Sequence, residues 1–531
     1  MRKNLTLLAV LALFTLAGLR AQDEDDRYIE PQFDIMPVMT DTFATNITVL
    51  TGSPAQQGLS MDVYMPMGDT ATDRAVVAIF PTGNFLPAYI NQGVYGTKTD
   101  SANVYLARQL AARGFVAVVA EYRQGWLPTA QDQIRQTETL LKAAYRGGQD
   151  AKALARYLRK TVAEDGNPYG IDDDKIAFWG FGTGGYVTLT HAFLDSIAEI
   201  ELNDQFYDGD GALLIDASVD GNVQGTTAGQ LNLVNNPDYS DDVALTVNAG
   251  GAIGDTSWIE SGPNNTNAFV GFHRVEDPFA PFDIGAVIVP TTMSTVINDV
   301  GGAYAVARIT NREGINSELT AANDTDLDDK FSDLSESLNE LNASYQTMEL
   351  DDTTGRPLSY DNLFPFVGDG GHWNWSNETV DRQTIAFINS TGRFAELDAD
   401  EIIGNEKAQN PNYNNPAAAK EVIDTMIAFF LPRALAAFDS TSTSVEELIA
   451  PTTVGLELFP NPATANFTVQ VADAYRIRQI DVYDMRGSRV AQVRGLDQSS
   501  YTFDRSNLAN GAYIVQLRFD EGTTARKVFL R

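Results

Sequence analysis

The chain has 531 residues, with 71 acidic and 37 basic side chains, a formal net charge of −34 and no cysteine. A charge this negative argues against nucleic acid or an anionic membrane as a partner. The missing thiols exclude disulfides, a thiolate nucleophile and sulfur-ligated metals. At this length more than one domain is expected.

The first 21 residues have the pattern of a secretory signal peptide. Arg2 and Lys3 supply a positive start, residues 5–19 are apolar, and Leu19-Arg20-Ala21 offers a cleavage site. The apolar stretch is short for a membrane span, and an acidic run follows it. We therefore expect an exported protein with no membrane span after cleavage, and an uncleaved anchor is the alternative. The polar residues 22–44 are expected to form an arm lying on the next domain.

Strands and helices are predicted to alternate from residue 45 onward. Residues 45–50 and 59–66 alternate apolar and polar side chains around a Gly/Pro turn, which predicts a β-hairpin. Continuous apolar runs at 74–80 and 115–123 are typical of strands buried on both faces. Helical spacing predicts helices at 102–113, 133–145 and 150–164. This alternation favours a mostly parallel sheet.

A glycine-rich stretch follows, Phe178-Trp179-Gly180-Phe181-Gly182-Thr183-Gly184-Gly185-Tyr186. It comes after a predicted strand and leads into a predicted helix at 187–194. In α/β-hydrolases a turn of this kind, with the pattern G-x-S-x-G, holds the nucleophile on a sharp elbow. Here Gly182 stands where the serine would be.

From Ser60 to Ala192 the chain resembles secreted carboxylesterases of the α/β-hydrolase superfamily. The similar segments, in order, are Pro81-Thr82-Gly83-Asn84-Phe85, Glu121-Tyr122-Arg123, Ala144-Tyr145-Arg146-Gly147-Gly148-Gln149-Asp150-Ala151, and Gly170-Ile171-Asp172 before the elbow. The resemblance implies an α/β-hydrolase fold, a mostly parallel sheet with flanking helices, over residues 45–438. It also implies hydrolysis of a small carboxylic ester. Because no zinc, EF-hand or phosphate-binding pattern is present, we expect no metal and no cofactor.

The rest of this domain is less regular in sequence. Residues 203–241, rich in Asp, Gly and Asn, are predicted to form an insertion of short strands and loops near the carboxyl edge of the sheet. The acidic segment 327–341 is predicted to be a helix and a candidate for a partial lid. The other predicted elements are strands at 242–249 and 268–273, helices at 301–310 and 417–438, and a loop at 364–373.

The resemblance implies a catalytic acid and histidine in that chain order. Asp277, after a predicted strand, matches the acid, and Asp299 is the competing candidate. His372, in a glycine-flanked loop, matches the histidine. His191 is expected to be a core or surface residue, and His273 a supporting residue close to the site.

The oxyanion donors implied by the resemblance are the backbone N–H groups of Gly83, Asn84 and Thr183, with Asn84 standing where the family uses glycine. Phe85, Trp126, Trp373 and Trp375 are candidates to line the binding site, or packing residues.

Gly182 offers no atom to attack a carbonyl, so the covalent route is closed at that position. Attack by the Thr183 hydroxyl, or by a water activated by His372, remains open. A catalytically inactive pseudo-hydrolase that binds a ligand or partner is the alternative function, and a surface adhesion role is the third.

In the C-terminal region the spacing of apolar residues changes to every second position. After a polar linker at 439–455, strands of period two predict a small all-β sandwich at 456–531. It resembles the type IX secretion sorting domain of Bacteroidetes-like bacteria, through Phe459-Pro460-Asn461-Pro462, Val482-Tyr483-Asp484-Met485-Arg486-Gly487 and Leu508-Ala509-Asn510-Gly511-Ala512-Tyr513. The resemblance implies the type IX machinery as a partner and a secreted or cell-surface protein. An ordinary carbohydrate-binding or adhesion sandwich is the alternative.

Overall fold

The computed structural model describes residues 27–531 with some gaps, and divides the chain into two units, Met1–Thr441 and Ser442–Arg531. The predicted signal peptide lies outside the described residues. The gaps are 51, 89–92, 129, 131, 261–266, 290–292, 320–321, 323–360, 367–370, 393–395 and 443–450, and, in the second unit, 473, 485–488, 494–495, 497, 506–507 and 520–521.

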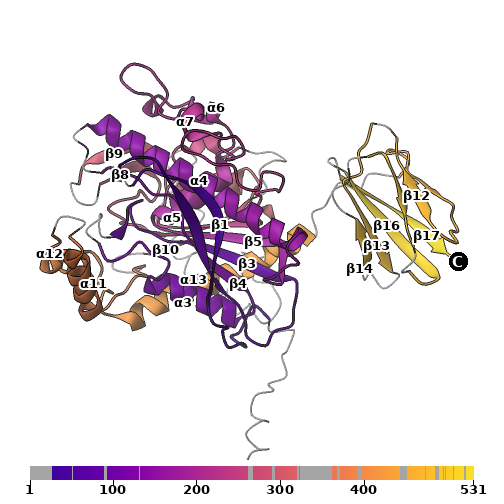
Figure 1. Cartoon of the computed structure of the whole chain (residues 1–531), viewed down its shortest axis with the longest axis horizontal. Helices are drawn as coiled ribbons and strands as arrows, with labels where there is room; N and C mark the ends of the chain where they lie inside the picture. Colours follow the sequence, from indigo (N-terminus) through magenta and orange to yellow (C-terminus); the bar gives the residue numbers. More distant parts are fainter. Residues whose placement is uncertain are drawn as a thin grey trace, which may run out of the picture. The chain divides into compact units, whose positions relative to one another are not determined.

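An eight-stranded sheet forms the centre of the first unit, in the order β1-β2-β4-β3-β5-β6-β7-β10 (Figure 1). The antiparallel hairpin of β1 and β2 pairs with β4 in the antiparallel sense, and all pairs from β4 to β10 are parallel. This order, with the antiparallel edge, is that of the α/β-hydrolase fold, as predicted. The strands are β1 (Met39–Thr48), β2 (Ala55–Tyr64), β3 (Arg74–Phe80), β4 (Val116–Ala120), β5 (Ile171–Phe181), β6 (Leu245–Ala249), β7 (Ala268–Arg274) and β10 (Leu363–Phe366).

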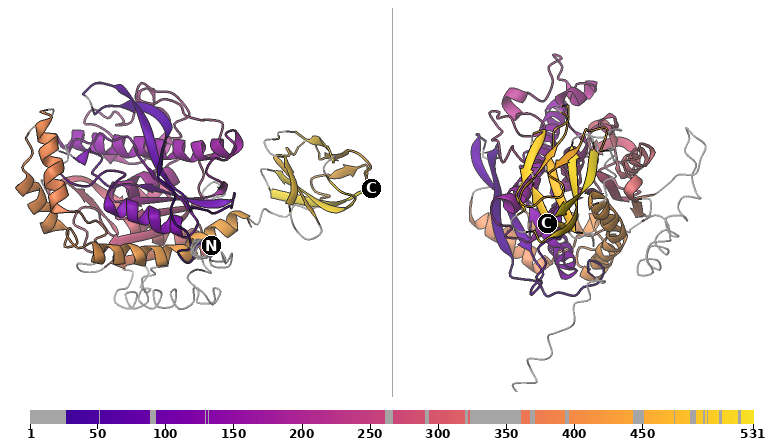
Figure 2. Two further views of the ribbon diagram at one scale, coloured as in Figure 1. Left: turned by 60° about the horizontal axis from the view of Figure 1, so that its bottom comes forward. Right: turned by 90° about the vertical axis from the view of Figure 1, so that its right-hand side faces the viewer.

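Helices cover both faces of the sheet (Figure 2). In β3, Val77 and Ile79 pack toward α3 (Ser101–Ala112) and α13 (Pro416–Ser442), while Val76 and Ala78 face the other way. That second face carries α4 (Gln133–Ala163), α5 (Thr183–Phe193) and α8 (Ala303–Arg312). Burial on both faces explains why the predicted strands at 74–80 and 115–123 are continuously apolar.

The helix α4 corrects the prediction of two separate helices, because it runs unbroken through Gly147 and Gly148. These glycines let α5 approach closely. A Cβ atom on Gly147 would lie 2.6 Å from Val187 Cγ2, and one on Gly148 would lie 2.7 Å from Thr190 Cγ2. The cost of glycine inside a helix is offset here by close helix packing.

Several other elements differ from the predictions. The predicted loop 364–373 begins inside the last sheet strand, β10, and the predicted linker begins inside α13. The hairpin of β8 (Ile284–Ile288) and β9 (Thr295–Gly301) was not predicted, nor were α11 (Glu378–Ser390) and α12 (Ala399–Gln409), which pack against each other (Figure 1). The predicted lid helix at 327–341 lies outside the described residues.

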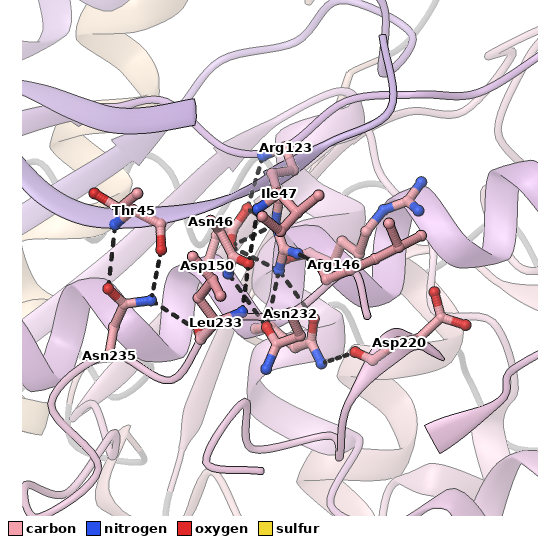
Figure 3. Close-up of polar contacts among 12 residues, drawn as sticks. Thr45, Asn46, Ile47, Arg123, Arg146, Asp150, Asp220, Asn232, Leu233 and Asn235 are labelled. Carbon is pink, nitrogen blue, oxygen red and sulfur yellow. Dashed lines mark hydrogen bonds and ion pairs between the residues drawn. The ribbon is translucent and has the colours of Figure 1, made fainter. Parts of the chain in front are cut away.

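A buried polar network holds the insertion 203–241 against α4 and the edge strand β1 (Figure 3). The Arg123 and Asp150 side chains are fully buried, and Arg123 Nε donates to both Asp150 oxygens at 2.9 Å. Arg123 Nη1 donates to the Leu231 carbonyl at 2.7 Å, and the Leu233 N–H donates to Asn46 Oδ1 at 2.8 Å. The strands predicted in the insertion are reduced to isolated bridges between single residues.

The described part of the predicted arm does lie on the first unit. The Tyr28 N–H donates to the Arg113 carbonyl at 2.8 Å, and Arg27 forms an ion pair with Asp69 at 2.7 Å. From Met39 onward the arm becomes strand β1, six residues earlier than predicted. In the described part of the chain, no helix combines the length and the apolar character needed to cross a membrane.

The second unit is the predicted β-sandwich. A three-stranded sheet, β11-β12-β15, and a four-stranded sheet, β14-β13-β16-β17, enclose one apolar core. In that core the rings of Phe467 and Phe503 stack at 5.1 Å. The strands are β11 (Glu457–Phe459), β12 (Phe467–Gln470), β13 (Gln479–Asp484), β14 (Arg489–Val493), β15 (Ser500–Phe503), β16 (Gly511–Phe519) and β17 (Gly522–Leu530).

Candidate functional site

The predicted elbow is present between β5 and α5. Gly182 adopts φ 50° and ψ −115°, a backbone conformation that strains other residues, and its N–H donates to the Ala249 carbonyl at 2.7 Å. Strain of this kind is typical of the position that presents a nucleophile. The elbow therefore retains its backbone geometry without a side chain.

A cavity of about 270 Å³ opens beside Gly182, at the carboxyl edge of the sheet. It brings together residues that follow several parallel strands of the sheet, among them β3, β5, β6, β7 and β10. The predicted site residues on its wall are Gly83, Asn84, Trp126, Gly182, Thr183, Asp277, His372 and Trp373.

The acid and histidine candidates lie at the ends of β7 and β10. Asp277 Oδ1 accepts hydrogen bonds from the N–H groups of Phe279 at 2.8 Å and Ala280 at 3.0 Å, which fix the carboxylate in its turn. The His372 carbonyl accepts from Asn412 Nδ2 at 2.7 Å, which ties its loop to the segment before α13. The competing acid, Asp299, is exposed on β9 and is absent from the cavity wall.

Two of the three predicted oxyanion donors have no acceptor among the residues that the structure describes. These are the N–H groups of Gly83 and Thr183. Thr183 is the first residue of α5, where the helix dipole favours negative charge. Buried N–H groups are normally paired, so unpaired donors on a cavity wall are suited to a ligand oxygen.

The two threonine hydroxyls near the elbow differ in their surroundings. The Tyr122 hydroxyl donates to the Pro81 carbonyl at 2.6 Å, so the Thr183 hydroxyl, 3.1 Å away, donates to Tyr122. Thr82 lies on the cavity wall, and a Cβ atom built on Gly182 would overlap its hydroxyl oxygen. Thr82 was not predicted as a site residue from the sequence.

Neither of the other histidines reaches the cavity. His191 is buried against the Phe178 ring, and burial lowers its pKa to about 3, which confirms it as a core residue. His273 is fully buried, and burial lowers its pKa as well. Its Nε2 lies 3.2 Å from the Ala280 carbonyl, which can only accept, so Nε2 carries the proton.

The aromatic candidates divide between the cavity and the core. Trp126 and Trp373 line the cavity, and the Trp373 ring packs on Phe181 at 5.4 Å. Phe85 is fully buried beneath the wall, with its ring 6.3 Å from that of Tyr186. Trp375 packs on Tyr105, away from the cavity.

The cavity wall also contains polar residues that were not predicted from the sequence: Tyr95, Glu406 and Asn410. Glu406 and Asn410 were missed because α12, which carries Glu406 and ends before Asn410, was not predicted. Burial raises the pKa of Glu406 to about 7, and repulsion from Asp381 and Asp100 adds to the rise, while the Val94 N–H opposes it. Burial likewise raises the pKa of Tyr95.

A second, smaller cavity of about 40 Å³ adjoins the first and has a largely apolar lining. Leu140, Tyr186 and Val287 lie on the walls of both. A ligand held at the elbow could therefore place a small apolar group against these side chains.

Residues 457–531 match the family model of the secretion system C-terminal sorting domain. This confirms the predicted type IX sorting domain. The protein is therefore exported across the outer membrane, to the cell surface or the medium, through an interaction of this domain with the type IX machinery.

Solved esterase structures are similar to this chain. Thermogutta terrifontis esterase 2, phosphorylated by paraoxon, is 16% identical with a TM-score of 0.26, and the match covers 46% of this chain and 73% of that one. A putative carboxylesterase from Lactobacillus plantarum is 11% identical with a TM-score of 0.29, and the match covers 52% of this chain and 84% of that one. No curated protein matches the chain. The assignment of the fold rests on the strand order of the sheet.

Proposed function

We propose that this exported protein hydrolyses small carboxylic esters in the cavity beside Gly182. The observation that supports the proposal is the convergence of Asp277, His372 and two unpaired N–H donors on one cavity. Acyl transfer needs a base, a group that orients the base, and donors for the oxyanion. The cavity contains a candidate for each of these three roles.

In this proposal His372 is the general base and Asp277 orients its imidazole. The ester carbonyl oxygen lies between the N–H groups of Gly83 and Thr183, where its developing negative charge is stabilised. Because Gly182 has no side chain, the attacking oxygen comes from another group. The small neighbouring cavity favours short acyl groups such as acetyl and butyryl.

The test is turnover of p-nitrophenyl acetate and butyrate by the full-length chain and by His372→Ala. We expect turnover above the buffer rate, reduced by about 10²- to 10⁴-fold in the variant, the range for loss of a general base. Equal turnover by the two proteins would contradict the assignment of His372.

Gly182 favours a second candidate, a pseudo-hydrolase that binds its ligand without turnover. In that case no ester is hydrolysed faster than in buffer, and a non-hydrolysable ketone analogue of the ester raises the melting temperature. That result would contradict ester hydrolysis.

A further inference from the structure

We propose that the hydroxyl of Thr82 is the nucleophile of this site and takes the place of the missing elbow serine. This inference rests on the proposed ester hydrolysis. It concerns the one component that the elbow lacks, an oxygen able to form a bond to the substrate carbonyl.

The register of two neighbouring strands places Thr82 opposite Gly182. β3 and β5 are parallel, with Phe80 paired to Gly180. Thr82 and Gly182 each lie two residues beyond this pair, so the two chains leave the sheet side by side. The hydroxyl of one is thereby brought to the elbow formed by the other.

The Thr82 hydroxyl occupies the volume that a side chain on residue 182 would fill. A Cβ atom built on Gly182 would overlap Thr82 Oγ1 and lie 3.0 Å from Thr82 Cβ. A serine oxygen is only one bond from its Cβ atom. The Thr82 oxygen is therefore close to where an elbow serine would present its own.

The hydroxyl of Thr82 is also available for chemistry. Among the described residues it has no hydrogen-bond partner, whereas the Thr183 hydroxyl is held by Tyr122. Thr82 shares the cavity wall with His372, and Gly83, the residue directly after it, supplies an unpaired N–H. A donor directly after the nucleophile is the arrangement used in α/β-hydrolases.

The proposed reaction proceeds in two steps. Thr82 Oγ1 gives its proton to the His372 imidazole and bonds to the ester carbonyl carbon, and the N–H groups of Gly83 and Thr183 stabilise the oxyanion. The bond to the alcohol oxygen breaks, the alcohol leaves with the proton from His372, and the acyl group remains on Thr82. Water, deprotonated by His372, then attacks the acyl group, releasing the acid and returning the proton to Thr82.

The test compares Thr82→Val, which keeps the shape and removes the oxygen, with Thr82→Ser, which keeps the oxygen. Each full-length protein is mixed with p-nitrophenyl acetate, turnover is followed, and acid-quenched samples are digested for mass mapping. We expect an acetyl group on the peptide containing residue 82 in the wild type and in Thr82→Ser. We expect Thr82→Val to carry no acetyl group and to lose at least about 100-fold in turnover.

The outcomes separate this inference from the proposed function. If Thr82→Val hydrolyses the ester at the wild-type rate, the protein is an esterase and Thr82 is not its nucleophile. If the wild type neither turns over the ester nor acquires an acetyl group, both proposals fail. A Thr82→Ser protein as inactive as Thr82→Val, with an unchanged melting temperature, would also overturn the role of Thr82.

A reciprocal experiment uses the overlap between the two positions. Gly182→Ser alone forces its side chain against Thr82, so we expect a lower melting temperature and no acetyl group on residue 182. Combined with Thr82→Gly, which removes the obstruction, Gly182→Ser should become acetylated at residue 182. Equal acetylation of residue 182 in the single and the double variant would show that the two side chains do not compete, and would overturn the geometric basis of the proposal.

Discussion

Two polar clusters in the first unit differ in how far their groups are hydrogen-bonded within the protein. Around Arg123 and Asp150, the fully buried ion pair is hydrogen-bonded by Asn46 and the insertion (Figure 3). In the same group, Arg146 Nε and Asp220 Oδ1 have no hydrogen-bond partner among the described residues. Around Gly182, two N–H groups and a threonine hydroxyl on the cavity wall have no partner among the described residues. The clusters lie in the same fold, but every side-chain nitrogen of Arg123 donates a hydrogen bond, whereas these groups on the cavity wall are unpaired within the described part of the chain.

Polar groups that maintain the fold and polar groups that bind a ligand differ in the partners that they have in the unliganded protein. Hydrogen bonds between buried groups such as Arg123 and Asp150 stabilise the fold, and the loss of either partner would cost free energy. Donors left unpaired on a cavity wall destabilise the unliganded protein, and this cost in free energy is removed when a ligand accepts hydrogen bonds from them. Changes in the first cluster should therefore alter stability, and changes in the second should alter turnover.

The largest effect is expected for Asp277→Asn, measured as kcat/KM for p-nitrophenyl butyrate. The amide keeps an oxygen to accept from Phe279 and Ala280, so the fold should be retained, but it cannot stabilise an imidazolium. We expect a loss on the order of 10³- to 10⁴-fold with little change in melting temperature. The matched control is Asp299→Asn, an exposed residue on β9, which should leave turnover unchanged. If Asp299→Asn lost turnover and Asp277→Asn did not, Asp299 would be the catalytic acid.

The next effect concerns stability, through Asp150→Asn in the buried network. The substitution removes the negative charge that faces a fully buried Arg123. We expect the free energy of unfolding to fall by about 3 to 5 kcal/mol, measured by urea denaturation.

The control for this variant is Asp165→Asn, which removes an exposed partner of Lys160 and should leave the urea midpoint unchanged. If Asp150→Asn were as stable as this control, the network would be dispensable and the contrast between the clusters would disappear.

The smallest effect is expected at Glu406, which is less fully hydrogen-bonded than the Arg123–Asp150 pair but, unlike the donors near Gly182, does have a partner. It accepts one hydrogen bond, from the Val94 N–H at 3.4 Å, and its pKa is raised to about 7. A carboxyl with a raised pKa holds its proton more tightly in the folded state. Its charge therefore costs stability as the pH rises from about 5 through 7.

Glu406→Gln keeps this position neutral at every pH. We expect the variant to gain on the order of 1 to 3 kcal/mol relative to wild type between pH 5 and pH 8, read from urea midpoints. Glu401→Gln, exposed on the same helix, is the control. A difference that does not depend on pH would argue that Glu406 is already charged in the folded protein at pH 5.

Prediction from the sequence was most successful where the pattern was long and local. The buried strands, the elbow and the sandwich were recognised because their spacing and turn residues lie within one stretch of chain. The continuity of α4 was missed because Gly147 and Gly148 resemble a break until Val187 and Thr190 are packed against them. β10 was predicted as a loop, since four residues are too few for a period to be recognised.

The sequence by itself determined the hydrolase-like domain, the sorting domain and the absence of a hydroxyl on residue 182. Only the tertiary structure decided that Thr82 lies against that residue. The contact arises from the register of two parallel strands separated by about a hundred residues, and the side chains within either stretch do not encode it. Local patterns fix which elements form, but pairing between strands fixes which side chains meet.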